Sequence, residues 1–268
     1  MTTTRGLREQ ADPITMLTAY DATTARLIDD CGIDILLVGD SMGTEALGYD
    51  STLPVTVEAV ERRTAAVVRG SDDALVVADM PFLSVGVDES ETVRNAGRML
   101  KEAGADAVKL ESGPHTVEMT ERLTQLGIPV MAHLGLTPQH VNQLGGYTRQ
   151  GTTEAAAKEI LSLARAHEDA GAFALVLEHV PANVAAQVTD DIDIPTIGIG
   201  AGGDCDGQVL VIDDVLGLSA DAPPFAEQFG DVRAAMTDAI KDYKQAVEAG
   251  SFPADKHSHV EDGLDDLG

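Results

Sequence analysis

Acidic residues follow three successive apolar segments in the first half of the chain, each at the carboxyl end of its segment. Asp40 follows Ile35–Val38, Asp79 follows Leu75–Ala78, and Glu111 follows Ala107–Leu110. A buried carboxylate is costly unless it is paired or bound to a metal ion. Carboxylates that neighbouring strands place close together are therefore candidates for binding a cation or transferring protons.

Two later segments place further ionisable side chains in the same way. Pro129–His133 ends in a histidine, and Phe173–Leu177 is followed by Glu178. An apolar surrounding suits a general base, so Glu178 is the candidate proton acceptor, with a further metal ligand or a salt bridge as its alternatives. His133 either hydrogen-bonds a substrate, tunes the metal shell or is structural.

Lys109 and Ser41 are candidates for holding an anionic substrate. Lys109 lies two residues before Glu111, so the period of a strand puts both side chains on one face. There it either binds a substrate anion or forms a buried salt bridge with a carboxylate. Ser41 follows Asp40 in a turn, where it either contacts a substrate carboxylate or caps the turn.

The donor set favours magnesium over zinc. Several carboxylates close together repel one another, and a divalent cation resolves that repulsion. Carboxylate oxygens with open positions suit Mg²⁺, which keeps waters and shares its coordination sphere with substrate oxygens. Zinc is less well matched because only one histidine and no cysteine is in range.

Strand and helix patterns alternate along the chain, separated by a recurring helix–Gly–strand–polar loop pattern. Alternation of this kind predicts a parallel sheet with right-handed crossovers. We expect one α/β domain, a (β/α)8 TIM barrel over residues 1–250 that includes the C-terminal helices, with active-site residues at the carboxyl ends of the strands. Residues 251–268 are expected to form an acidic, partly disordered tail. A doubly wound sheet is the alternative, but its G-x-G-x-x-G turn is absent after the first strand.

The 268 residues carry 45 acidic and 18 basic side chains, a net charge of −27. This excess argues against nucleic-acid binding, which needs clustered Lys and Arg. No apolar run is long enough to span a membrane, and the N-terminus lacks a signal-peptide pattern, so we expect no membrane association and a cytoplasmic location. A surface this acidic is typical of proteins from halophiles, because molar salt screens repulsion within about 3 Å.

Several motifs together resemble the ketopantoate hydroxymethyltransferase family, in that family's order and spacing. They are Val38–Gly43, Asp50–Thr56, Ala78–Phe82, Val108–Glu111, Ala132–Gln139, Leu177–Pro181 and Ile197–Gly202. The resemblance implies a Mg²⁺-dependent barrel enzyme of pantothenate and coenzyme A biosynthesis. Its reaction moves a hydroxymethyl group from 5,10-methylenetetrahydrofolate, or a related pterin, to 3-methyl-2-oxobutanoate and gives 2-dehydropantoate.

The same resemblance implies roles for individual residues. Asp40 and Asp79 would bind the metal with Glu111 as the third carboxylate, and Glu178 would accept the C3 proton from the metal-chelated oxo acid. Lys109, Ser41 and the two aspartates would hold the oxo acid. The resemblance also implies a large homo-oligomer, such as a decamer.

The chain departs from the family pattern where Ser112–Gly113 replaces two glycines and where the helix before the first strand is shortened. The long loop Leu134–Gly151 could be a lid or part of the folate site. Two alternative functions stay open. One is a Mg²⁺-dependent 2-oxo acid carbon–carbon lyase, and the other is a metal-dependent binding protein without catalysis.

Overall fold

The computed structural model describes residues 1–219 and 222–261. The chain divides into two compact units. One consists of Met1–Ile212 with Pro223–Ala226, and the other of the described parts of Asp213–Ala222 and Glu227–Gly268. The expected extension of one domain to residue 250 stays a prediction. Residues 262–268 of the expected acidic tail lie outside the described residues.

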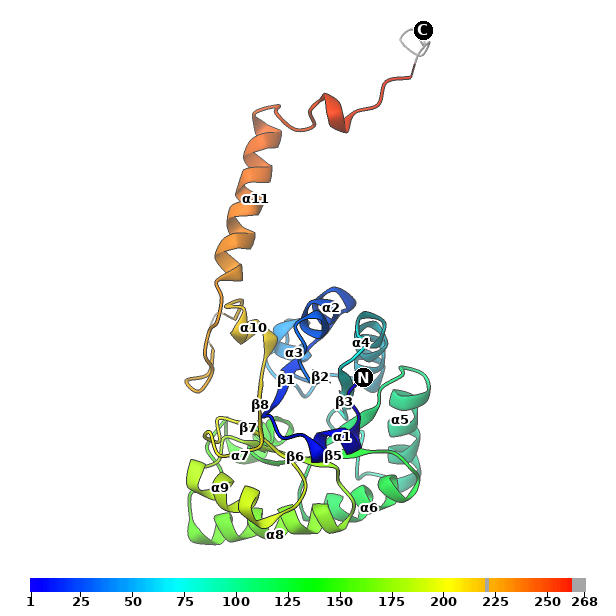
Figure 1. Ribbon diagram of the computed structural model, residues 1–268, viewed down its shortest axis with the longest axis vertical. Helices are drawn as coiled ribbons and strands as arrows, with labels where there is room; N and C mark the ends of the chain where they lie inside the picture. Colours follow the sequence, from blue (N-terminus) through cyan, green and yellow to red (C-terminus); the bar gives the residue numbers. More distant parts are fainter. Residues whose placement is uncertain (220–221, 262–268) are drawn as a thin grey trace. The chain divides into compact units, whose positions relative to one another are not determined.

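The first unit is a closed barrel of parallel strands in the order β1 to β8 (Figure 1). Its strands are β1 Ile14–Thr18, β2 Ile35–Val38, β3 Leu75–Asp79, β4 Ala107–Glu111, β5 Val130–Gly135, β6 Ala174–Glu178, β7 Thr196–Ile199 and β8 Gly207–Leu210. The predicted TIM barrel is therefore confirmed, and the doubly wound alternative is excluded.

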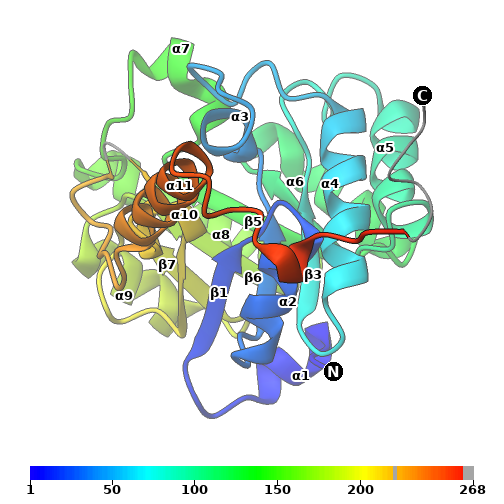
Figure 2. The same ribbon diagram turned by 90° about the horizontal axis from the view of Figure 1, so that it is seen from above.

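Helices connect the strands and lie outside the barrel, as Figure 2 shows from above. The main ones are α2 Ala22–Asp30, α4 Val57–Gly70, α5 Glu89–Lys101, α6 Val117–Gln125, α8 Glu154–Asp169 and α9 Ala182–Asp191, and α1 Thr4–Glu9 precedes β1. Several begin at a polar cap whose side chain accepts backbone N–H groups, as Asp21 does for α2 and Thr56 for α4. These caps fix where each helix starts after its loop.

Short helices follow several of the strands. They are α3 Met42–Glu45 after β2, η1 Pro114–Thr116 between β4 and α6, and η2 Pro138–His140 and α7 Val141–Leu144 within the segment Leu134–Gly151 that the sequence predicted as a loop. β8 ends at Leu210, and α10 Ile212–Val215 begins two residues later. β5 continues two residues beyond His133, so His133 lies inside its strand and not at its end.

The C-terminal unit contains α11 Val232–Glu248 and η3 Asp255–His257. α11 starts at Val232, where the Asp231 side chain accepts the N–H of Ala234. None of the residues of α11 is buried.

Two apolar layers hold the barrel together. The interior is filled by side chains that alternate along the strands, among them Ile35, Val77, Met131, Val176 and Ile197. A second layer packs β5 and β6 against α8 and α9 and includes Leu134, Leu175, Leu177, Ile160 and Val184. Because the interior face of each strand continues to its carboxyl end, polar residues there point into the mouth of the barrel.

Candidate active site

A cavity of about 110 Å³ opens at the carboxyl ends of the barrel strands. All of the residues predicted from the sequence line it: Asp40, Ser41, Asp79, Lys109, Glu111, His133 and Glu178. Strand register explains this meeting, since Asp79 pairs with Lys109 and Glu111 pairs with His133 across the sheet. The roles of these residues stay predictions, whereas their meeting in one cavity is observed.

Lys109 and Asp79 form a buried ion pair. Lys109 Nζ lies 2.7 Å from Asp79 Oδ1, and both side chains are almost fully buried. Burial alone would lower the pKa of Lys109, but the carboxylates of Asp79, Asp40 and Glu111 raise it, so the amine stays charged. The salt bridge expected as one alternative for Lys109 is therefore present, in a position that also faces the cavity.

Asp40 lies just beyond β2, and its backbone forms a hydrogen bond with the side chain of Asp79. The Asp40 N–H donates to Asp79 Oδ2 at 3.2 Å. Burial raises the pKa of Asp40 well above its ordinary value, and the carboxylates of Asp79 and Glu111 raise it further. Gly39 permits this close turn, because a Cβ there would lie 2.7 Å from Ser41 Oγ.

Glu111 is held at the end of β4 by the loop after β5. Its two oxygens accept the backbone N–H of Gln139 at 3.0 and 3.2 Å. Burial raises the pKa of Glu111 to about 7, although His133 and Lys109 act to lower it. Ser112, which departs from the family pattern, bonds Leu110 O through its hydroxyl and accepts the N–H of His133, so it joins β4 to β5.

His133 stands between Lys109 and Glu178. Its Nδ1 lies 3.3 Å from Lys109 Nζ, and its Nε2 lies 3.1 Å from Glu178 Oε2. An ammonium group can only donate, so Nδ1 must accept, and a neutral ring then carries its proton on Nε2. That N–H lies near Glu178 but is not aligned for a hydrogen bond.

The backbone around Glu178 is tightly constrained. Gly135 pairs with Glu178 across β5 and β6 and has a φ of 100°. A Cβ at Gly135 would lie 2.2 Å from the carbonyl oxygen of Glu178. His179, the next residue, adopts a φ of 49°, which a side chain with a Cβ disfavours. Glu178 is therefore fixed by its strand and by the sharp turn after it.

Ser41 faces a tyrosine that the sequence reasoning missed. Tyr20 Oη and Ser41 Oγ are 2.9 Å apart, and Ser41 makes no side-chain cap at the start of α3. The turn-capping alternative for Ser41 is therefore wrong. Tyr20 directly follows the segment of β1 and Ala19, so the strand-end rule that found Asp40 could have found it too.

One wall of the cavity is apolar. The residues lining it include Leu37, Val176, Ile199 and Val209. The cavity therefore combines an apolar wall with carboxylates and Lys109, a mixed lining that is typical of sites for small molecules.

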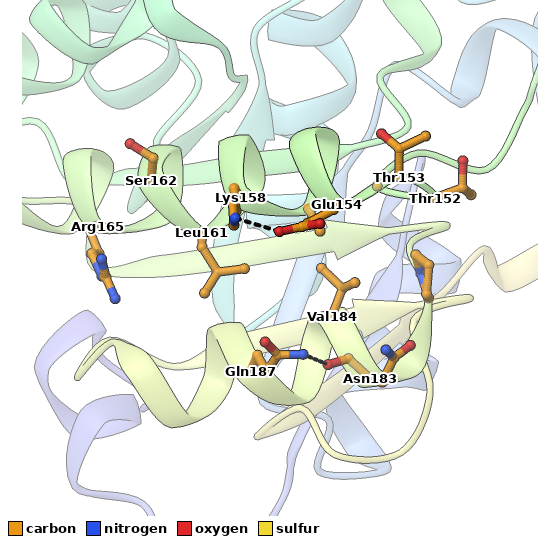
Figure 3. A pocket seen from close by; sticks show the side chains of 13 residues that line it. Thr152, Thr153, Glu154, Lys158, Leu161, Ser162, Arg165, Asn183, Val184 and Gln187 are labelled. Atoms are coloured by element: carbon orange, nitrogen blue, oxygen red, sulfur yellow. Dashed lines mark hydrogen bonds and ion pairs between the residues drawn. The ribbon is translucent and has the colours of Figure 1, made fainter.

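A larger hollow of about 760 Å³ lies elsewhere, between α8 and α9 (Figure 3). Its charged side chains are already paired, Lys158 with Glu154 one turn away and Arg165 with Asp191 of α9. It contains none of the residues that the sequence predicted. Size alone therefore does not identify the site.

The donor set of the strand-end cavity fits a magnesium ion. Asp40, Asp79 and Glu111 offer only carboxylate oxygens, and Lys109 neutralises one of them. Within residues 1–219 and 222–261, no three Asp, Glu, His or Cys side chains form a ready metal-ligand cluster. Mg²⁺ needs only one or two carboxylates beside waters and substrate oxygens, so the carboxylates of this cavity still suit a magnesium ion.

Fold and site together define a (β/α)8 barrel with a carboxylate-lined cavity at the carboxyl ends of its strands, which is where barrel enzymes place their active sites. The model of the family described as ketopantoate hydroxymethyltransferase matches residues 1–255. The chain is 68% identical over 269 residues to the 3-methyl-2-oxobutanoate hydroxymethyltransferase of Haloarcula marismortui, with 100% of each chain covered. It is 70% identical over 259 residues to the enzyme of that name from Halobacterium salinarum, covering 97% of this chain and 94% of that one.

Among solved structures, phosphonopyruvate hydrolase in complex with oxalate and Mg²⁺ matches with a TM-score of 0.61 at 13% identity, covering 97% of this chain and 92% of that one. At this identity the likeness shows the shared barrel fold. The chain belongs to the ketopantoate hydroxymethyltransferase family and is a transferase that acts in pantothenate biosynthesis. The two relatives come from halophilic archaea, which agrees with the interpretation of the acidic composition.

Proposed function

We propose that the protein transfers a hydroxymethyl group from 5,10-methylenetetrahydrofolate, or a related pterin, to 3-methyl-2-oxobutanoate. The product is 2-dehydropantoate, and the reaction depends on Mg²⁺. The observation that carries the proposal is the juxtaposition of a buried carboxylate cluster, Glu178 and an apolar wall around one small cavity. The phosphonopyruvate hydrolase complex with oxalate and Mg²⁺ is consistent with a cation in such a barrel.

Each side chain has a distinct task in this reaction. Asp40 and Asp79 hold the cation, with Glu111 as the third carboxylate. Lys109, kept charged by its neighbours, binds the oxo acid together with Ser41 and His133. When bound, the cation supplies Lewis acidity toward negative charge on the oxo acid.

Glu178 removes the proton from C3 of the oxo acid. The nucleophilic C3 then forms a carbon–carbon bond to the one-carbon unit. Both bonds from that carbon to the folate nitrogens break and water supplies the hydroxyl oxygen, while the two nitrogens take up the proton lost from C3 and one proton of that water. Nε2 of His133 lies 3.1 Å from Glu178 Oε2, close to the group that takes the proton. The apolar wall excludes water from C3 and accommodates its methyl groups.

Deuterium exchange at C3 tests the base, the cation and the substrate together. We expect 3-methyl-2-oxobutanoate in D₂O to lose its C3 proton signal in NMR when wild-type protein and Mg²⁺ are present without folate. Glu178→Gln should bind the oxo acid and lose exchange by about 10²-fold or more. Exchange at the wild-type rate in this variant would remove Glu178 as the base.

The alternatives give different outcomes in the same assay. A metal-dependent binding protein would bind the oxo acid without any exchange. A 2-oxo acid carbon–carbon lyase would cleave its substrate without a one-carbon donor. Formation of 2-dehydropantoate that requires the added pterin supports hydroxymethyl transfer over both.

We also propose that the enzyme is a cytoplasmic homo-oligomer, such as a decamer. The helix α11 supports assembly, because Met236, Ile240, Tyr243 and Val247 recur at helical spacing and are all exposed. No helix in the described part of the chain is long and apolar enough to cross a membrane. Light scattering in molar KCl tests assembly, and a mass equal to one chain would contradict it.

A further inference from the structure

Gln139 is the one residue of the Ala132–Gln139 motif whose side chain reaches the carboxylates while the proposed reaction gives it no task. It lies in η2, on the segment that connects β5 to α8. The chain places it 99 residues from Asp40 and 28 residues from Glu111, yet it contacts both.

Both kinds of N–H group on Gln139 are engaged. Its side-chain Nε2 donates to Asp40 Oδ2 at 2.9 Å and to the carbonyl oxygen of Met80 at 3.0 Å. Its backbone N–H donates to Glu111 at 3.0 Å. One residue therefore joins the ends of β2, β3 and β4 to the loop after β5.

Asp40 needs such a partner more than the other carboxylates do. It lies in the turn beyond β2, outside the strand ladder, whereas Asp79 and Glu111 are the last residues of their strands. A side chain in a turn has more freedom unless another group orients it. Gln139 supplies that orientation from across the cavity.

The chemistry of an amide suits this position. Lys109 neutralises the carboxylate that it contacts, but Gln139 carries no charge. The amide can therefore fix one oxygen of Asp40 and leave the negative charge available to a cation. Residues that hold metal ligands in this way commonly set the affinity of the site.

We propose that Gln139 is a positioning residue that orients Asp40 and Glu111 for a divalent cation. The inference rests on the proposed function for the identity of the cation site. It makes the segment after β5 part of that site, because the same residue anchors the segment to the carboxylates.

Titration with Mn²⁺, followed by electron paramagnetic resonance, tests the assignment without relying on turnover. Gln139→Met keeps the length of the side chain and removes its donor, so we expect Mn²⁺ affinity to fall by about 10- to 100-fold. The kcat for C3 exchange should fall even at saturating Mn²⁺. Gln143→Met is the matched control, because Gln143 is exposed on the same segment and should bind Mn²⁺ as the wild type does.

Circular dichroism establishes that each variant is folded. If Gln139→Met does not fold, Gln139→Asn, which withdraws the amide by one methylene, takes its place with the same expected direction. Wild-type Mn²⁺ affinity and wild-type kcat in the folded variant would overturn the assignment, and so would a wild type that binds no Mn²⁺. A wild type that binds Mn²⁺ but exchanges no C3 proton would overturn the proposed reaction and leave the Gln139 effect measurable.

Discussion

The two ends of the barrel both carry acidic side chains, but those side chains meet different partners. At the amino end, Asp34 Oδ2 accepts the N–H and the hydroxyl of Thr15, both at 2.8 Å. Asp206 Oδ2 accepts the same two groups of Thr196, at 2.8 and 2.9 Å. In each pair the threonine hydroxyl also accepts the backbone N–H of the aspartate. Each aspartate thus supplies a hydrogen-bond acceptor to a strand residue that lies beyond the start of the neighbouring strand.

At the carboxyl end the carboxylates face one another. Asp40, Asp79 and Glu111 are all less than a tenth exposed, and the charge of Lys109 acts on all three. Strand ends of this polarity present carbonyl oxygens, which cannot donate to a carboxylate. A carboxylate at the amino end is thus satisfied by the strand backbone. At the carboxyl end the N–H groups of Asp40 and Gln139, which lie beyond their strands, reach Asp79 and Glu111, and the remaining charge calls for a cation.

This difference indicates that acidic residues at the amino end of the barrel serve stability, whereas those at the carboxyl end serve function. An acidic residue that backbone N–H groups surround stabilises the fold, and substitution should cost stability with little effect on turnover. An acidic residue that faces other carboxylates keeps charge available to a ligand, and substitution should cost turnover first. Variants at the two ends test this division.

The largest effect is expected at Asp79. Asp79→Asn keeps the shape of the side chain and removes the negative charge that faces Lys109. We expect C3 exchange to fall by more than about 100-fold and its Mg²⁺ dependence to be lost. An exchange assay over a range of Mg²⁺ concentrations measures both, and an unchanged Mg²⁺ titration would place Asp79 with the structural carboxylates.

A large effect on stability is expected at Lys109, the cation among the buried carboxylates. Lys109→Met leaves those carboxylates without it, and breaking a buried pair costs about 3–5 kcal/mol. We expect that loss in unfolding without metal, partial recovery with Mg²⁺, and a raised KM for the oxo acid. Lys158→Met is the control, because the Lys158–Glu154 pair is exposed and worth about 0–1 kcal/mol. Equal losses in the two variants, or an unaltered KM, would contradict the role assigned to Lys109.

A smaller effect, confined to stability, is expected at Asp34. Asp34→Ala removes the acceptor of the Thr15 N–H and hydroxyl, which should cost about 0.5–1.5 kcal/mol because water can replace the acceptor at this exposed site. Chemical unfolding measures this loss, and kcat for C3 exchange should stay within about twofold of wild type. Asp12→Ala, at an exposed position close to the start of β1, serves as the control. A fall in kcat without a fall in stability would break the division between the two ends.

The residues at the carboxyl end of the barrel could be predicted from the sequence, because the direction of each strand follows from its local pattern and decides which residues meet at one end. Once Leu75–Ala78 is a strand and its neighbours are parallel, Asp79 must meet Lys109 and Glu111 at the same end. The partners across the cavity could not be predicted in this way. Gln139 reaches Asp40 from a loop whose path depends on packing, and no periodicity specifies such a contact.

The amino end shows the opposite case. The recurring helix–Gly–strand pattern includes Asp34 after Gly32 and Asp106 after Gly104, but their role was not recognised. Asp106 Oδ2 accepts the N–H of Val76 on the preceding strand, a contact that depends on the stagger between strands. Stagger follows from closing the barrel as a whole, so the alternation of elements predicts the fold but not these contacts.

The smallest effect is expected from pH acting on Asp29. Burial by itself would raise the pKa of Asp29, but the N–H groups of Asp72 and Ala74 and the Ser71 hydroxyl lower it below its ordinary value. A lowered pKa in the folded state means that the carboxylate contributes stability above the pKa of the unfolded chain. That contribution disappears as the pH falls through the lower, folded-state pKa.

Asp29→Asn should therefore cost about 1 kcal/mol at pH 7, and its difference from wild type should shrink below about pH 4. Urea unfolding in molar KCl measures both proteins over this range. Asp30→Asn is the matched control, because Asp30 is the next residue and is exposed. A difference from wild type that stays constant from pH 7 to pH 3 would show that Asp29 acts through its shape and not its charge, and the hydrogen-bonded carboxylates of the amino end would then need another explanation.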